Sequence, residues 1–199
     1  IKKIILDNLE EELEIDRDSV KESDMLINDL FADSLIITMI IVASVNLLLI
    51  ALAPEAVSIF APKEYYDAIW IIPPVAMSVF FMYCYDLFAK FQFYFEKSHY
   101  IAIASICGAV LNIILNYIFI PIFGYYAAGY TTLMCYIVYD IVHFIFMKKV
   151  CKENLGNIKI FDIKILLSIA GIFVFFGFVV MALYNMLLIR MITLVLFCM

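Results

Sequence analysis

Long apolar runs separated by short polar links dominate the chain after residue 33. A run of about 20 apolar residues is long enough to cross the hydrocarbon core of a bilayer as an α-helix. The sequence predicts an all-α polytopic membrane helix bundle of about six spans. They are expected at about residues 35–53, 68–91, 101–120, 126–147, 163–183 and 187–199.

Proline, glycine and lysine residues mark the expected ends of these helices. Pro54 and Pro62 are expected to bracket a short amphipathic link after the first span. Pro121 and Gly124 are expected to stop the third span in a tight turn. Residues 148–164 are predicted to form the longest polar loop.

The acidic charge of the chain is confined to its start. Residues 1–33 hold eleven acidic and four basic residues, a net charge of −7, whereas the whole chain carries −6. The mean hydropathy is +1.04 and 66% of the residues are hydrophobic, so lipid is the expected solvent for the rest. We therefore predict two parts: an acidic helical segment over 1–34, and a transmembrane part over 35–199 that runs to the last residue and is expected to be a fragment.

Lysines predict the orientation in the membrane. The links at 90–99 and 148–164 lie on one side if every helix crosses, and they hold most of the lysines outside the acidic start. The opposite links carry only Lys63 before the last span. The positive-inside rule then predicts a cytoplasmic location for the lysine-rich links and for the N-terminal segment.

Several function classes are not expected. The five cysteines are odd in number and lack CxxC spacing, so we predict no disulfide framework and no metal site. No HExxH, GxSxG or glycine-rich phosphate loop occurs, and the chain is not predicted to be an enzyme. The basic residues lie in short membrane-side links, which is not typical of nucleic-acid binding.

Asn112 and Asn116 are the most informative polar residues within an apolar run. They are one helical turn apart and therefore share a face of the third span. Amides are costly in hydrocarbon unless they are paired, so this face is expected to meet protein or water. Two interpretations stay open: the pair binds substrate in a cavity, or it forms interhelical hydrogen bonds.

Charged residues near the span ends give further candidates. Arg190 is a candidate for binding phosphate or an acidic sugar, with snorkelling to the interface as the alternative. Asp140 and His143 are candidates for ion coupling, with an interfacial pair as the alternative. Asp86 and Lys90 are expected to form a local ion pair across one helical turn.

Five short motifs in residues 40–199 give a family resemblance when they are read in order. They are Ala53-Pro54-Glu55; Tyr65-Tyr66-Asp67-Ala68; Phe91-Gln92-Phe93-Tyr94-Phe95-Glu96-Lys97; the Asn112, Asn116, Ile120-Pro121, Gly124 block; and Ala127-Ala128-Gly129-Tyr130-Thr131-Thr132. This part resembles the C-terminal half of Wzx-type O-antigen and polysaccharide flippases, of the multidrug/oligosaccharidyl-lipid/polysaccharide superfamily.

The resemblance implies a fold and a function. It implies that this chain is one lobe of a two-lobed bundle of 12 to 14 helices in the bacterial inner membrane. The implied protein partner is the missing N-terminal lobe. The implied substrate is an undecaprenyl-linked oligosaccharide, whose sugar crosses a hydrated cavity while its tail stays in membrane lipid. Two alternatives stay open: a multidrug or small-molecule antiporter of the same superfamily, and a membrane acyltransferase served by a fused carrier segment.

The acidic segment carries a second resemblance. Its most similar stretch is Leu26-Ile27-Asn28-Asp29-Leu30-Phe31-Ala32-Asp33-Ser34-Leu35. This stretch resembles the first half of an acyl carrier protein, with Phe31 where that family usually has glycine and without the family's last two helices. The resemblance implies phosphopantetheine attachment at Ser34. Apart from that group, no cofactor is expected.

Overall fold

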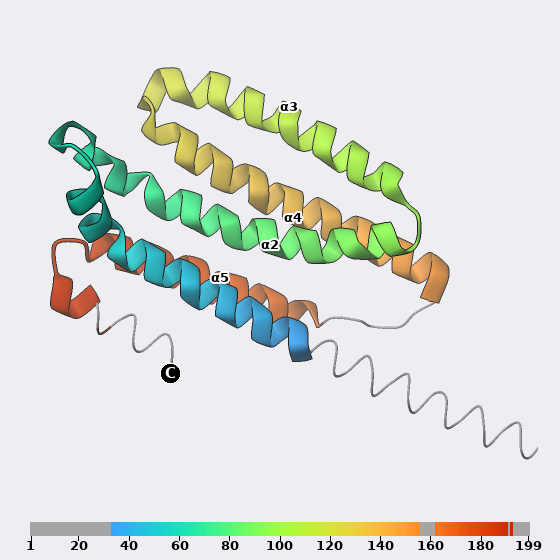
Figure 1. Cartoon of the computed structure of the whole chain (residues 1–199). Helices are drawn as coiled ribbons and strands as arrows, with labels where there is room; N and C mark the ends of the chain where they lie inside the picture. The colour runs from blue at the N-terminus through green and yellow to red at the C-terminus, as the bar shows by residue number, and fades with distance from the viewer. Residues whose placement is uncertain (1–32, 156–161, 191, 193–199) are drawn as a thin grey trace, which may run out of the picture. The chain divides into compact units, whose positions relative to one another are not determined.

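The computed structural model describes residues 33–155, 162–190 and 192, and all regular structure in them is helical. The elements are a first helix, Asp33–Phe60; the 3₁₀ helix η1, Lys63–Trp70; and the α-helices α2, Ile72–Tyr94; α3, Ser98–Phe123; α4, Tyr126–Leu155; and α5, Ile163–Ala182 (Figure 1). The predicted all-α class is confirmed. Most of the acidic segment and of the predicted sixth span, 187–199, lies outside the described residues.

Five helices in the described ranges are long and apolar enough to cross a membrane: the first helix and α2 to α5. They match the first five predicted spans, and the chain is therefore a multi-pass membrane protein. The chain divides into two units, Ile1–Thr38 and Met39–Met199. In the first unit, the Thr38 hydroxyl donates to the Ser34 carbonyl at 2.7 Å. Apart from Ser34, the residues described below belong to the second unit.

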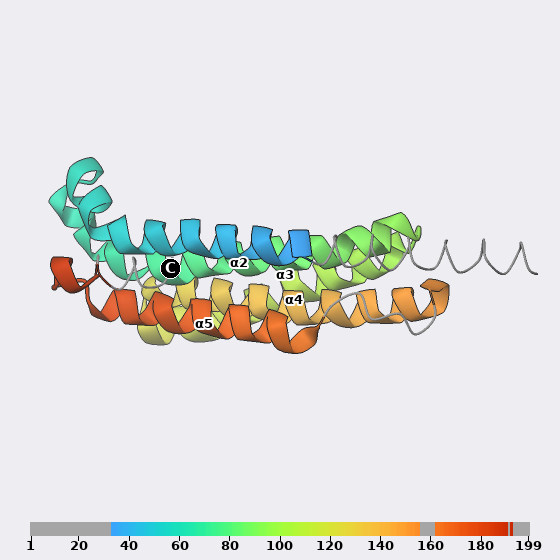
Figure 2. The same ribbon diagram turned by 90° about the horizontal axis from the view of Figure 1, so that it is seen from below.

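Helix α4 lies between α2 and α3, and α2 also contacts α5 and η1 (Figure 1). Seen from below, α2 to α5 run roughly along a common axis (Figure 2). Because they alternate in direction, the end of α2 and the end of α4 lie at the same end of this unit. Helix α2 has the largest buried share of the five helices, and its buried side chains include Met77, Phe80 and Cys84.

Glycines permit close contact between these helices. A Cβ atom on Gly129 of α4 would lie 3.2 Å from the Ile71 carbonyl oxygen and from Pro74 at the start of α2. A Cβ atom on Gly177 of α5 would lie 3.0 Å from Met77. Small residues at helix contacts are typical of membrane bundles, where packing replaces the hydrophobic effect between helices.

The predicted link at Pro54 is wrong, because the first helix continues through this proline to Phe60. Proline has no N–H, so it cannot donate to the carbonyl of the residue four positions earlier, Ile50. The Tyr184 hydroxyl donates to that carbonyl at 2.9 Å, from a segment 134 residues further along the chain. A tertiary hydrogen bond therefore replaces the missing helical one.

Two other expected helix ends also differ. Helix α3 includes Pro121 in its last turn and is followed by Gly124, whose φ of 70° favours glycine. Helix α4 continues past Lys148 to Leu155, so the first half of the predicted 148–164 loop is helical. No glycine or proline interrupts residues 148–155, and lysine and glutamate are good helix formers, so the helix extends beyond its apolar part.

Helix α3 exposes most of its apolar surface. None of its most hydrophobic stretch is buried in the bundle, and Ile106, Ile113 and Tyr117 are each more than 60% exposed. A helix that is apolar on all sides is suited to lipid or to another membrane helix rather than water. The only buried residue of α3 is Ala104.

Candidate functional site

The two asparagines of α3 form a short hydrogen-bond chain toward α4. The Asn116 side-chain amide donates to Asn112 Oδ1 at 2.9 Å, and the Thr131 hydroxyl of α4 donates to Asn116 Oδ1 at 2.6 Å. The Asn112 amide lies 3.6 Å from Cys135 Sγ, also on α4. The predicted interhelical hydrogen bonding is thus confirmed, while substrate binding by Asn112 and Asn116 stays a prediction.

A pocket of about 290 Å³ lies beside Asn112. Its polar groups are the Asn112 amide, the Ser105 hydroxyl and three tyrosines, and its full lining is Tyr85, Ser105, Gly108, Ala109, Asn112, Cys135, Tyr136 and Tyr139. We call it the tyrosine pocket. The Ser105 and Tyr139 hydroxyls are 2.6 Å apart, and the Tyr85 ring packs against Tyr139 with centroids 4.5 Å apart. Helices α2, α3 and α4 all contribute to it, each from its interior turns.

A larger apolar pocket of about 580 Å³ lies further along α3 and α4. Its lining is Leu115, Phe119, Phe123, Tyr126, Ala127, Tyr130, Thr131 and Met134, and we call it the aromatic pocket. Thr131 lines it and also bonds to Asn116, which in turn bonds to Asn112 in the tyrosine pocket. The asparagine–threonine chain therefore connects a polar pocket with an apolar one.

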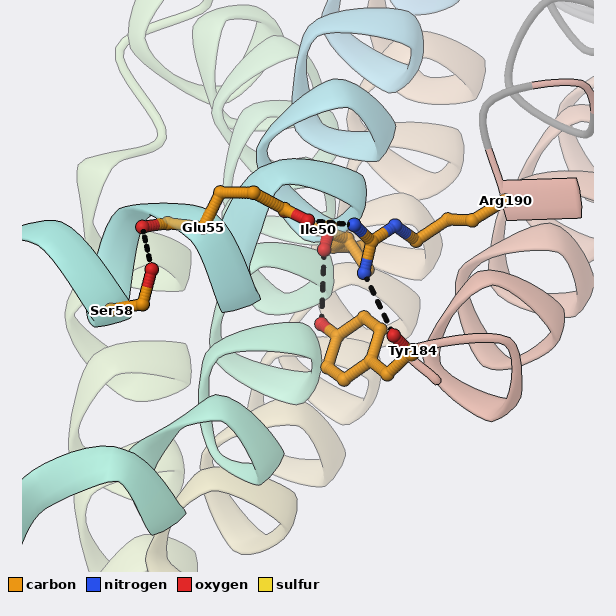
Figure 3. A network of polar contacts seen from close by, with 5 residues as sticks. All are labelled: Ile50, Glu55, Ser58, Tyr184 and Arg190. Atoms are coloured by element: carbon orange, nitrogen blue, oxygen red, sulfur yellow. Dashed lines mark hydrogen bonds and ion pairs between the residues drawn. The ribbon is translucent and has the colours of Figure 1, made fainter. Parts of the chain in front are cut away.

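Arg190 lies next to Glu55 and Tyr184 (Figure 3). It is 1% exposed and forms an ion pair with Glu55 of the first helix. It also donates to the Tyr184 carbonyl at 3.2 Å and stacks over the Tyr184 ring, 5.6 Å from its centroid. The snorkelling interpretation is therefore wrong, and no described hydrogen bond or ion pair joins Arg190 to Asn112 or Asn116.

Tyr184 is a structural residue that the sequence analysis missed. Burial raises the pKa of its phenol, so the hydroxyl stays protonated and donates to the Ile50 carbonyl. Pro54 was the available sequence signal, because a proline within a helix leaves the carbonyl four residues earlier without its helical donor. What the sequence did not indicate was which distant donor would fill the position.

His143 is fully buried between α2 and α4. Its ring Nδ1 lies 3.1 Å from the side-chain amide nitrogen of Gln92, which also donates to the His143 carbonyl at 3.2 Å. The interfacial interpretation of His143 is therefore wrong. Asp140 is half-buried one turn earlier, and one of its carboxylate oxygens is buried with no hydrogen-bond partner among the described residues. Ion coupling by Asp140 and His143 stays a prediction.

The remaining sequence candidates have simple surroundings. Asp86 and Lys90 form the expected ion pair at 3.1 Å, and both side chains are more than half exposed. Ser34 is exposed at the start of the first helix, where phosphopantetheine attachment stays a prediction. Within residues 33–155, 162–190 and 192, no group of His, Cys, Asp and Glu residues is placed to hold a metal ion.

The described geometry therefore provides two pockets lined by α3 and α4, one of them also by Tyr85 of α2, and two separate buried polar contacts, Gln92–His143 and Glu55–Arg190. Comparison of the chain with protein-family models, with curated proteins and with solved structures finds no match.

Proposed function

We propose that this chain is the C-terminal lobe of a bacterial inner-membrane flippase that translocates lipid-linked oligosaccharides. The ordered motifs of residues 40–199 suggest this family. The observation that carries the proposal is the tyrosine pocket, because it places hydroxyl and amide groups along the interior of three membrane-spanning helices. Transporters commonly bind their substrates near the middle of such bundles.

The chemistry of the tyrosine pocket suits a sugar. Hydroxyl and amide groups both donate and accept hydrogen bonds, as sugar hydroxyls require. The tyrosine rings offer flat apolar faces for the C–H side of a sugar ring. At about 290 Å³, the pocket is at the small end of ligand sites, which supports binding of a single sugar unit rather than a whole oligosaccharide.

The aromatic pocket supports an amphipathic substrate. It is apolar, has about twice the volume of the tyrosine pocket, and meets it through Thr131 and Asn116. In the proposed function the sugar is bound by the polar pocket and the lipid chain follows the apolar one. The apolar surface of α3 would face lipid or the N-terminal lobe.

Charge supports the proposed orientation. Lys97 after α2 and Lys148, Lys149 and Lys152 on the last turns of α4 lie at the same end of the bundle. The other end, around η1, has Lys63 with Glu64 and is not enriched in lysine. By the positive-inside rule, the lysine-rich end is cytoplasmic in the proposed topology.

Photocrosslinking tests the substrate assignment directly. The chain in nanodiscs is incubated with a polyprenyl-linked oligosaccharide that carries a diazirine on its first sugar, and the labelled peptides are identified by mass spectrometry. We expect labels on α2, α3 or α4 at the tyrosine pocket. Asn112→Leu should reduce labelling roughly tenfold, because losing one buried hydrogen bond costs about 1–1.5 kcal/mol.

The matched control is Asn154→Leu, because Asn154 is exposed and bonds to the Val150 carbonyl of its own helix. This variant should leave labelling unchanged. Labels spread evenly over the lipid-facing surface, or equal labelling of both variants, would contradict the proposed sugar site.

A small-molecule antiporter is the second candidate, and Asp140 favours it. A half-buried carboxylate with an unpartnered oxygen is a typical counterion for an organic cation or a proton. Asp140→Asn separates the two functions: it should abolish proton-linked efflux of a fluorescent cation if the chain contributes to an antiporter. It should leave sugar photolabelling intact if the tyrosine pocket binds the substrate.

A further inference from the structure

The contact between Gln92 and His143 depends on where the imidazole carries its proton. Both side chains are 0% exposed, and they join α2 to α4 across 51 residues of sequence. The Gln92 amide nitrogen lies 3.1 Å from His143 Nδ1 and 3.2 Å from the His143 carbonyl oxygen. A single NH₂ group therefore reaches two atoms of the same residue.

The carbonyl oxygen fixes the orientation of the amide. It only accepts hydrogen bonds, so the amide nitrogen of Gln92 must face it. If the amide turned over, its oxygen would lie against another oxygen. With the nitrogen in place, Nδ1 must accept the second hydrogen, which requires a neutral imidazole with its proton on Nε2.

Protonation of Nδ1 removes this contact. The added N–H would point at the hydrogens of the Gln92 amide, so a hydrogen bond becomes a repulsion between two donors. Turning the amide over would satisfy Nδ1 but would break the bond to the carbonyl. No orientation of Gln92 satisfies both groups of a charged His143.

The pair has two further buried polar atoms and two aromatic neighbours. His143 Nε2 and Gln92 Oε1 are buried and have no hydrogen-bond partner among the described residues. The imidazole packs against the rings of Tyr85 on α2, at 5.3 Å, and of Tyr139 on α4, at 4.6 Å. The ionisable groups that pack against the ring are these two phenols, and the Asp140 carboxylate belongs to the preceding turn of α4. The described hydrogen bonds and ring contacts of His143 come from α2 and α4 alone.

We propose that Gln92 and His143 form a proton-binding site that controls the packing of α2 against α4. With a neutral imidazole the contact is closed. When a proton from solvent binds Nδ1, the contact opens, and the ends of the two helices beyond it move apart. This inference rests on the geometry of the pair and does not depend on the proposed transport function.

The tautomer is measured by NMR on the chain in nanodiscs with ¹⁵N-labelled histidine. The sequence has two histidines, and exposed His99 serves as the internal reference. Near pH 8, His143 should be neutral with a bare Nδ1, and near pH 5 both of its nitrogens should carry protons. A proton on Nδ1 of the neutral form, or a His143 that stays neutral near pH 5, would overturn the proposal.

The helix movement is measured by electron paramagnetic resonance between two spin labels. Phe93 on α2 and Ile145 on α4 are exposed positions close to the pair, and both would be replaced by cysteine in a background without the five native cysteines. The wild-type contact should give a longer label distance near pH 5 than near pH 8. His143→Gln should give the same distance at both values, and the matched control His99→Gln should retain the change.

The two measurements separate the outcomes. Protonation of His143 without any change in the label distance would overturn the proposal, as would a change that persists in His143→Gln. If His143→Gln does not fold, Gln92→Leu is measured in its place. This variant should also lose the pH-dependent change in label distance, because the contact between residues 92 and 143 is absent at both pH values.

Discussion

In the Glu55–Arg190 ion pair, replacing Glu55 should lower the stability of the protein more than replacing Arg190. Glu55→Gln leaves a guanidinium that is 1% exposed without its counterion, and removing one partner of a buried pair costs about 3–5 kcal/mol. The Glu55 side chain is 41% exposed, so some of its charge interaction is already screened and we expect about 3 kcal/mol. Arg190→Met leaves a carboxylate on a side chain that is 41% exposed, although its Oε2 atom is buried without a partner among the described residues, and should cost about 1–2 kcal/mol.

The double variant Glu55→Gln/Arg190→Met tests the origin of the asymmetry. No charge is left buried in it, so its stability should be close to that of Arg190→Met alone. The free energy of unfolding is measured by titration from a mild detergent into sodium dodecyl sulfate. A matched control, Asp86→Asn, breaks the exposed pair with Lys90 and should cost less than about 0.5 kcal/mol.

Equal costs for the two single variants would refute the argument that the burial of Arg190 determines the effect. Strict additivity in the double variant would refute the ion pair itself, because it would mean that the two side chains do not interact.

Three further predictions use the same unfolding titration. Tyr184→Phe removes the hydroxyl that bonds to the carbonyl left free by a proline, and should cost about 1–3 kcal/mol; an unchanged stability would mean that water replaces the hydroxyl. Gly129→Ala forces a methyl group against backbone and should cost about 1–3 kcal/mol, whereas Gly171→Ala, with nothing within 4 Å of the added atom, should be neutral or stabilising. Asn116→Ala and Thr131→Ala should each cost about 0.6–1.7 kcal/mol and should be less than additive together, and full additivity would contradict their hydrogen bond.

The five membrane helices could be predicted from the sequence because spanning length and hydropathy are local properties. The residues at which these helices end were harder to predict. The first helix passes Pro54 because a hydroxyl 134 residues away bonds to the freed carbonyl, and no local pattern contains that information. The end of α4 was placed too early because Lys148 was interpreted as the start of a loop, although a helix can leave the membrane and continue in water.

For the candidate sites too, local features could be predicted from the sequence, whereas contacts between distant segments could not. Asn112 and Asn116 were predicted to share a face, and they do, because helical spacing determines it. The partner of Asn116, Thr131, depends on how α3 and α4 meet. Arg190 was interpreted as a residue that binds phosphate or an acidic sugar, or that snorkels, because its place in the sequence does not indicate that Glu55 is its partner. Gln92 was quoted within a family motif but was not predicted to form a buried contact, since a single amide in an apolar run does not indicate its partner.

The hydrogen bond from Tyr184 to Ile50 also has a consequence for the order of assembly. A ribosome releases the helix that contains Pro54 long before it reaches the donor that this helix needs. Until then, the Ile50 carbonyl must rely on water or on the insertion machinery. The last turns of this membrane segment therefore reach their final environment only after the four spans that follow it have been synthesised.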